Sequence, residues 1–304
     1  MRPFDLLVAG EINPDLILSG NVVPEFGQVE KLVNSAALTV GSSSAIFACG
    51  AARLGLKVAF IGVCGADVFG RFMLDEMSKR GVDVSNVILR EDGQTGLSVI
   101  LNRHADRAIL THPGLIAELQ AADIPDSLLA QAHHLHVASY FLQTKLQPDL
   151  PALFNRAHVL GLTTSLDTNY DPSEKWEGFD DLLAVTNVFL PNEAEAKSLT
   201  AAATAEEAAD RLQVKVEAAA IKLGKAGALG ISRGRKIRVD SIPVNVMDTV
   251  GAGDSFDAGF LYGYLNGWEM EKSLRLACVC GALSTRAAGG TAAQPSLDEA
   301  LKFL

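Results

Sequence analysis

Short apolar runs and amphipathic stretches alternate along most of the chain. The unbroken apolar run at 6–9 predicts a buried strand. Phe69, Met73 and Met77 recur at helical spacing within 67–80, which predicts an amphipathic helix. Strands that alternate with helices favour a mostly parallel sheet with helices on both faces. Further signals of this kind lie at 45–54, 58–63, 134–138, 150–160, 164–167, 185–190, 193–199, 205–214 and 219–223.

Two segments, at about 13–40 and about 87–112, depart from this rhythm. In both, apolar and polar residues alternate, and Gly or Pro marks the turns, which predicts antiparallel strands with one exposed face. Because both segments lie between core strands, we expect them to form one small sheet that projects from the main domain and covers a cleft. The whole chain, 1–304, is then a single domain with this sheet as its lid.

The composition suits one soluble globular domain, since 48% of the 304 residues are hydrophobic and 20% are charged. The formal net charge is −10 and no block of Lys or Arg occurs, so nucleic acid and anionic membranes are unfavourable partners. The longest uncharged stretch, 32–52, contains too many polar residues to cross a bilayer. Cys49, Cys64, Cys278 and Cys280 lack metal-binding spacing and are typical of reduced thiols in a cytoplasmic protein.

The most informative motif, at 248–260, contains Gly251-Ala252-Gly253-Asp254. The two glycines permit a tight turn, and the apolar spacing that follows predicts a helix. Such a turn directs several unbonded N–H groups and the positive end of the helix dipole to one place, where a nucleotide phosphate can bind. A carboxylate there repels phosphate, so we interpret Asp254 as the base that accepts a proton from an attacking hydroxyl.

An ordinary helix N-terminus explains the same residues. Asp is a favoured N-cap residue, and glycine often precedes a helix. Short glycine motifs also occur in proteins that bind no nucleotide. Taken alone, the motif leaves both interpretations open.

The motif resembles the C-terminal signature of the ribokinase-like (PfkB) carbohydrate kinases, and the similarity extends over nearly the whole chain. The resemblance implies a three-layer α/β/α sandwich with a mostly parallel central sheet, a small β-sheet lid, and a homodimer formed through the lid. It also implies ATP as phosphate donor, Mg²⁺ as bridging ion, Asp254 as base, and the main-chain N–H groups of 251–254 as an anion hole. Dependence on a monovalent cation such as K⁺ stays open, and the loops near Asp248 and at 287–291 would hold it. The other segments that carry the resemblance are 10–15, 41–55, 62–70, 95–96, 167–169, 192–195 and 222–228.

Asp15 and Asn13 are candidates for binding the substrate. Asp15 follows a strand end, and its carboxylate can accept hydrogen bonds from two hydroxyls. An Asn-Pro-Asp turn explains the same residues. The resemblance favours the first interpretation, because the corresponding aspartate of the family holds sugar hydroxyls.

Three further substrate candidates are Gly41, Ser42 and Tyr140. The family usually has a second glycine where Ser42 stands and an asparagine where Ile46 stands. We therefore expect a substrate other than ribose, with fewer hydroxyls or an apolar face near these positions. Tyr140 aligns near a position that contacts substrate in the relatives, although a buried aromatic at a strand end is an equal interpretation.

Five residues outside the main motif are candidates for nucleotide and metal. Gly224 and Gly227 resemble the nucleotide-binding turn of the family. Lys222 replaces the commoner threonine and is long enough to reach a phosphate, with a surface lysine as the alternative. Asn192, a further nucleotide candidate, and Glu195 have the spacing of a capping box, and in the family they organise Mg²⁺ and its waters. Both roles can hold at once.

These features predict an ATP-dependent kinase that phosphorylates a hydroxyl of a small neutral sugar. Kinases of acidic sugars often have an arginine where Asp171 stands, so we expect a substrate without a carboxylate or phosphate. A nucleoside kinase of the same family is the nearest alternative. The other is a sugar or nucleotide sensor without turnover, because Ser42 and Ile46 depart from the family pattern.

Overall fold

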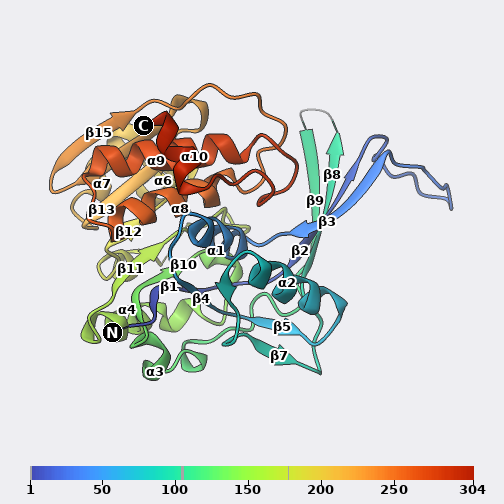
Figure 1. Ribbon diagram of the computed structural model, residues 1–304, viewed down its shortest axis with the longest axis horizontal. Helices are drawn as coiled ribbons and strands as arrows, with labels where there is room; N and C mark the ends of the chain where they lie inside the picture. The colour runs from blue at the N-terminus through green and yellow to red at the C-terminus, as the bar shows by residue number, and fades with distance from the viewer. Residues whose placement is uncertain (1, 104–105, 177) are drawn as a thin grey trace.

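The computed structural model describes residues 2–103, 106–176 and 178–304. Within these residues the centre is a nine-stranded sheet in the order β15-β14-β13-β12-β11-β10-β1-β4-β6 (Figure 1). In β1 (Phe4–Ala9), Leu6 and Val8 face one apolar core, whereas Leu7 and Ala9 face another. A strand that is buried on both faces requires a continuous apolar run, which is the pattern found at 6–9.

Neighbouring strands from β13 to β6 are parallel, and β14 and β15 extend the sheet as antiparallel strands. Because parallel strands end at the same edge of a sheet, the residues that follow them are brought together there. Asp167 and Asn192 come shortly after such strands, and Lys222 ends one. The strands are β4 (Val58–Ile61), β6 (Val82–Asp83), β10 (Ala132–Val137), β11 (Thr163–Leu166), β12 (Val188–Phe189), β13 (Ala218–Lys222), β14 (Ala228–Ser232) and β15 (Arg235–Val239).

Helices pack on both faces of the sheet, which gives the predicted α/β/α layers (Figure 1). One core contains side chains of α1 (Ser43–Arg53), α2 (Val68–Lys79), α8 (Ala252–Leu265), α9 (Met270–Ser284) and α10 (Leu297–Ala300). The other contains side chains of α3 (Asp126–Leu129), α4 (Leu150–Val159), α5 (Asp180–Leu183), α6 (Glu193–Thr200) and α7 (Ala205–Leu212). Phe256 and Phe260 anchor α8 in the first core, so the start of this helix is held rigidly.

A separate four-stranded sheet projects from the main body and forms the lid (Figure 1). Its strands, in spatial order, are β3 (Ser35–Val40), β2 (Pro14–Ser19), β8 (Leu97–Arg103) and β9 (Asp106–His112). The prediction that these strands are all antiparallel was wrong, because β2 and β8 pair in parallel. They belong to hairpins from different parts of the chain, so no tight turn forces an antiparallel junction.

The second predicted lid segment, 87–112, extends beyond the lid. β7 (Ile88–Arg90) pairs instead with β5 (Val63–Gly65) in a two-stranded sheet. The alternation of apolar and polar residues predicts strands there, but it does not say which strand is the partner. Residues 104 and 105 of this segment lie outside the described residues.

The cysteines behave as the sequence predicts for structural thiols. All four are buried and form no disulfide. Burial raises the pKa of Cys49 to about 12, so its thiol stays protonated and unreactive. In the described part of the chain, no helix combines the length and apolar character needed to span a bilayer.

Candidate active site

α8 begins at a glycine turn. Gly251 has a φ of 70°, in the left-handed region, and a Cβ at this position would lie 2.8 Å from the Gly290 Cα. Only glycine adopts this turn without both backbone strain and overlap. Gly251 also has no side chain to cap the helix. The Ala252 N–H donates to Thr249 O at 3.3 Å, and no side chain covers the N–H groups of Gly253 and Asp254, which an anion can reach. The turn therefore has the geometry expected of an anion hole.

Asp254 lies in the first turn of α8 with 8% of its surface exposed. Burial, together with the negative charge of Asp167, raises the pKa of Asp254 well above its usual value, while the Lys222 ammonium acts in the opposite direction. The Ser43 hydroxyl, at the start of α1, also acts to lower the pKa of this carboxyl. A carboxyl with raised proton affinity beside an anion site is suited to accept a proton from a hydroxyl.

A cavity of about 610 Å³ opens beside this turn. Ala252 and Gly253 line it, together with Lys222 and the loop that contains Gly224 and Gly227. The volume is sufficient for a nucleotide, and the lining combines apolar walls with a few polar groups. The apolar and small residues of the wall include Ile242, Val244, Phe256, Cys278, Gly281 and Ala282.

The lid presents a polar face that contains Asp15. Thr39 and Ser98 lie opposite Asp15 on the neighbouring strands, and Thr111 lies opposite Ser98, so all four share one face. Gly41 packs so closely that a Cβ there would overlap the Asp15 carboxylate. Glycine at position 41 therefore leaves room for the Asp15 carboxylate and places no side chain in front of it.

The Asn13 amide lies beside the Asp15 carboxylate. Asn13 Nδ2 is 3.5 Å from Asp15 Oδ1 and 3.4 Å from Ser98 Oγ. Burial raises the pKa of Asp15 to about 7, the Arg107 charge opposes this, and the charge of Asp248 adds to it. Arg107 Nη1 lies 3.8 Å from Asp248 Oδ1, which links the lid to the segment that precedes the glycine turn.

Asn192 and Glu195 form the predicted capping box at the start of α6. Glu195 N–H donates to Asn192 Oδ1 at 2.9 Å, and Asn192 N–H donates to Glu195 Oε2 at 2.8 Å. Burial raises the pKa of Glu195 to about 7, and the charge of Asp167 adds to the effect. Within the described residues, no group of three or more His, Cys, Asp or Glu side chains could hold a metal directly.

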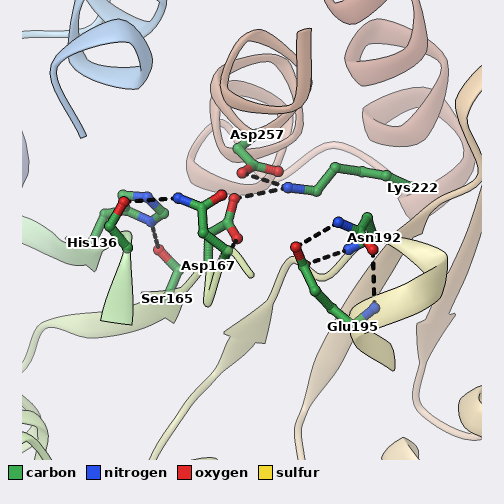
Figure 2. Close-up of polar contacts among 9 residues, drawn as sticks. His136, Ser165, Asp167, Asn192, Glu195, Lys222 and Asp257 are labelled. Atoms are coloured by element: carbon green, nitrogen blue, oxygen red, sulfur yellow. Dashed lines mark hydrogen bonds and ion pairs between the residues drawn. The ribbon is translucent and has the colours of Figure 1, made fainter. Parts of the chain in front are cut away.

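Lys222 lies between two buried carboxylates (Figure 2). Its Nζ donates to Asp167 Oδ2 at 2.8 Å and to Asp257 Oδ2 at 2.9 Å. Although burial opposes its ionisation, Asp167 has a lowered pKa, because the Lys222 ammonium lies against it. The interpretation of Lys222 as a surface lysine was wrong, since its side chain is 13% exposed and paired.

Two histidines of β10 lie beside this cluster. His136 Nδ1 is 2.7 Å from Ser165 Oγ (Figure 2). The same hydroxyl is 2.7 Å from His134 Nε2. Burial lowers the pKa of His136 to about 3, against the opposing charge of Asp167. Both imidazole rings are therefore uncharged near neutral pH and pack beside the site.

The comparisons with known proteins agree with this geometry. The family model described as "pfkB family carbohydrate kinase" matches residues 5–297. The chain belongs to the pfkB family of carbohydrate kinases. A 2-dehydro-3-deoxygluconokinase of Bacillus subtilis is 32% identical over 92% of this chain and 90% of its own length. A fructokinase of Klebsiella pneumoniae is 31% identical over 87% of this chain and 91% of its own length.

Solved structures show that this carbohydrate kinase has the ribokinase-like fold predicted. A ribokinase II candidate from E. coli, in complex with ATP and Mg²⁺, superimposes with a TM-score of 0.87 at 22% identity. The alignment covers 99% of this chain and 98% of that chain. Both the three-layer sandwich and the separate small sheet are thus confirmed as properties of the fold.

The two departures from the pfkB pattern have structural explanations. Ser42 has a φ of 64°, and its hydroxyl donates to the Glu11 main-chain oxygen at 2.7 Å and accepts from Ala45 N–H at 3.0 Å. Ile46 is buried and packs against Gly251 and Gly290. Ser42 therefore caps α1, and Ile46 supports the glycine turn. Neither side chain offers a polar group to a sugar in this arrangement.

Tyr140 lies in the core of this kinase. Its ring centroid is 4.8 Å from that of Phe179 and 5.3 Å from that of Phe141. Burial raises the pKa of its hydroxyl. These contacts favour the interpretation as a buried aromatic over a role in substrate binding.

Glu11 was missed by the sequence reasoning. Its Oε1 accepts hydrogen bonds from the Ser139 hydroxyl at 2.8 Å and from the Ser42 hydroxyl at 3.0 Å. Asn169 donates in turn to Ser139 Oγ at 2.7 Å. This network ties the ends of β1, β10 and β11 to the start of α1, next to the residues of the site. An acid directly after Gly10, at the end of the predicted strand, was the available signal.

Proposed function

We propose that this kinase transfers the γ-phosphate of ATP to a hydroxyl of a small neutral sugar, with Asp254 as base. One observation carries the proposal: the Asp254 carboxyl directly follows Ala252 and Gly253, which line the large cavity, in the first turn of a helix with no side-chain cap. The triphosphate would occupy the cavity, and the sugar would lie towards Asp15. The E. coli protein with a similar fold, solved with ATP and Mg²⁺, supports the choice of donor.

Each group has a separate task in the transfer. Asp15 and Asn13 hold the sugar hydroxyls and orient the acceptor. The N–H groups of 252–254 stabilise the negative charge of the transferring phosphoryl group. The acceptor oxygen forms a bond to the γ-phosphorus while the bond to the β,γ-bridging oxygen breaks, and the hydroxyl proton passes to Asp254. The products are ADP and a sugar phosphate.

The residues also suit the ions that the family implies. Mg²⁺ would reduce the charge of the phosphates, and Glu195 and Asn192 would orient its waters. Each oxygen of the Glu195 carboxylate has a second lone pair beyond its bond to Asn192.

For K⁺, we propose the junction at which Gly289 N–H donates to Asp248 Oδ2 at 2.9 Å. Exchange of K⁺ for Na⁺ in the assay tests that site.

The charges around Asp15 favour a neutral substrate. Asp248 and Glu11 add negative charge to that of Asp15 itself. Asp171 contributes nothing to this argument, because its carboxylate accepts hydrogen bonds from Ser173 and Trp176 within its own loop. A sugar acid is the second candidate, since the Arg107 charge acts on Asp15 from the lid.

A substrate panel tests the proposal. The enzyme is incubated with ATP, Mg²⁺ and each of a set of neutral sugars, sugar acids and nucleosides, and ADP release is measured. We expect the highest kcat/KM for a neutral sugar. A higher value for a sugar acid would assign the specificity to Arg107, and a higher value for a nucleoside would support the nucleoside kinase. Ligand binding without ADP release across the panel would support the sensor.

Sugar binding should weaken as the pH falls through about 7. Burial places the pKa of Asp15 at about 7, and protonation removes acceptor capacity from the carboxylate, so the loss begins near neutrality. We expect KM for the sugar to rise up to about 10-fold between about pH 8 and pH 6 at saturating Mg-ATP. Asp15→Asn cannot ionise and should show no such slope. A flat wild-type profile would contradict the assignment.

We also propose that two copies of this chain pair through the lid. Leu16, Leu38, Val99 and Leu110 lie opposite one another on neighbouring strands, on the face away from Asp15. Leu110 is 63% exposed and Leu38 is 37% exposed. An apolar row across the outer face of a sheet is typical of a subunit contact.

Leu110→Glu should convert this dimer into a monomer, because it would place two charges in the contact. Light scattering with size-exclusion chromatography measures the mass. Val159→Glu is the matched control, since Val159 is 87% exposed on α4 and lies outside the lid. A wild-type monomer at high concentration would rule out the contact.

We place the protein in the cytoplasm. Its four cysteines are buried free thiols, and thiols persist in reduced form in that compartment. The proposed donor, ATP, is also available there.

A further inference from the structure

Lys222 connects two buried acids with the anion hole. Its Nζ contacts Asp167 and Asp257, whose side chains are 2% and 1% exposed (Figure 2). Lys222 also lines the cavity, and its Nζ lies 3.7 Å from the place that a Cβ on Gly253 would occupy. The ammonium is therefore next to the main chain that would face a phosphate.

Asp257 is difficult to explain as a purely structural residue. It lies one turn after Asp254 on α8, and its Oδ1 has no donor among the described residues. Burial raises the pKa of Asp257 well above its usual value; the Lys222 ammonium acts in the opposite direction, and the charge of Asp167 and a hydrogen bond with that carboxyl add to the rise. Burial of a carboxyl with incomplete hydrogen bonding opposes folding, and apolar residues in place of a buried ion pair often stabilise a protein. The arrangement is explained if the position of Lys222 matters for the reaction.

We propose that Asp257 is a positioning residue, which fixes the Lys222 ammonium beside Gly253 so that it stabilises the phosphoryl group during transfer. The inference rests on the proposed role of the α8 turn as the phosphate site. Two acidic side chains hold the ammonium before the substrate arrives, so little reorganisation is needed in the transition state. The threonine that is commoner in the family at position 222 is too short to span from β13 to both acids.

A double-mutant cycle tests this coupling. We expect Lys222→Met to lower kcat about 30-fold with KM for the sugar changed less than about threefold, because the charge acts on the transferring group. Asp257→Asn should lower kcat about fivefold. The double variant should be as slow as Lys222→Met alone, because Asp257 acts through the lysine. Losses that multiply, or a Lys222→Met enzyme within about twofold of wild type, would overturn the proposal.

Melting temperatures separate this role from a structural one. The double variant removes a buried acid along with the buried cation, so its melting temperature should exceed that of Lys222→Met. If the cluster only stabilised the fold, the kcat of the double variant would rise above that of Lys222→Met together with its melting temperature. We expect no such rise in kcat. Should Lys222→Met fail to fold, Lys222→Gln replaces it in the cycle. Absence of wild-type turnover would instead contradict the kinase function itself, which keeps the two failures distinct.

The pH profile gives a second measurement that a structural role would not change. The groups around Asp254 are Asp167, Lys222, Glu11 and the Ser43 hydroxyl, with Asp257 one turn along the same helix. The Lys222 charge lowers the pKa of Asp254. Loss of this charge should therefore raise that pKa and move the acid limb of the kcat profile to higher pH. Lys222→Arg should leave the limb in place, and an unmoved limb in Lys222→Met would contradict the proposal. Lys236→Met is the control, because Lys236 pairs with Asp210 on the surface.

Discussion

Replacing Asp254 by Asn is expected to lower kcat at least about 100-fold while ATP binding stays within about threefold of wild type. The change keeps the shape of the side chain and removes only its capacity to accept a proton. The N–H groups of the α8 turn and the cavity beside it are unchanged. Steady-state kinetics with the best sugar of the panel, and calorimetric titration with ATP, give the two quantities.

The same variant should be more stable than the wild type. The pKa of Asp254 is raised in the folded protein, so the folded state holds this proton more tightly than the unfolded chain does. The stabilising effect of protonation is present at low pH and is lost as the pH rises, and at neutral pH the carboxyl therefore opposes folding. Asn carries no charge at any pH and removes this cost. A variant with normal turnover, or one that loses ATP binding, would contradict the role of Asp254 as base.

Gly251→Ala is expected to lower kcat about 100-fold, comparable to the loss of an oxyanion-hole donor. The new Cβ would meet the main chain of Gly290 at 2.8 Å, which cannot move aside as a flexible side chain can. The turn must then shift, and the N–H groups of α8 move away from the transferring phosphate. Kinetics at saturating ATP and sugar measure this effect on the chemical step.

Gly267→Ala is the matched control for this variant. Gly267 follows the other end of α8 with a φ of 68°, and a Cβ there would meet no atom within 4 Å. A left-handed alanine lowers the free energy of unfolding of both variants by about 1–2 kcal/mol, but only Gly251→Ala also creates an overlap. We expect similar falls in melting temperature from the strain alone and near-normal kcat for Gly267→Ala. Equal losses of kcat would mean that general destabilisation explains both.

The glycine turn could be predicted from the sequence because its parts are adjacent. Gly251 and Asp254 lie in one short segment, and the helical spacing of Phe256 and Phe260 follows directly. Local geometry of this kind depends on neighbours along the chain, which the sequence displays. The capping box of Asn192 and Glu195 could be predicted for the same reason.

The partners of Lys222 and Glu11 could not be predicted in the same way. Lys222 and Asp257 are 35 residues apart, and Glu11 and Ser139 are 128 residues apart. Only the order of strands in the sheet brings them together, and a periodic pattern does not specify that order. The parallel junction of β2 and β8 was missed because alternation shows that a strand forms without showing its direction.

Asp15 and Leu16 are consecutive residues of β2 and therefore point to opposite faces of the lid. The same short strand thus contributes to the proposed sugar site on one side and to the proposed contact between two copies on the other. The cavity proposed for the nucleotide is lined by residues of β13, α8, α9 and the loops at 224–227 and 241–249, and its lining does not include this strand. Dilution would then weaken sugar affinity before it affected ATP, and the specific activity of this enzyme at low sugar would depend on its own concentration.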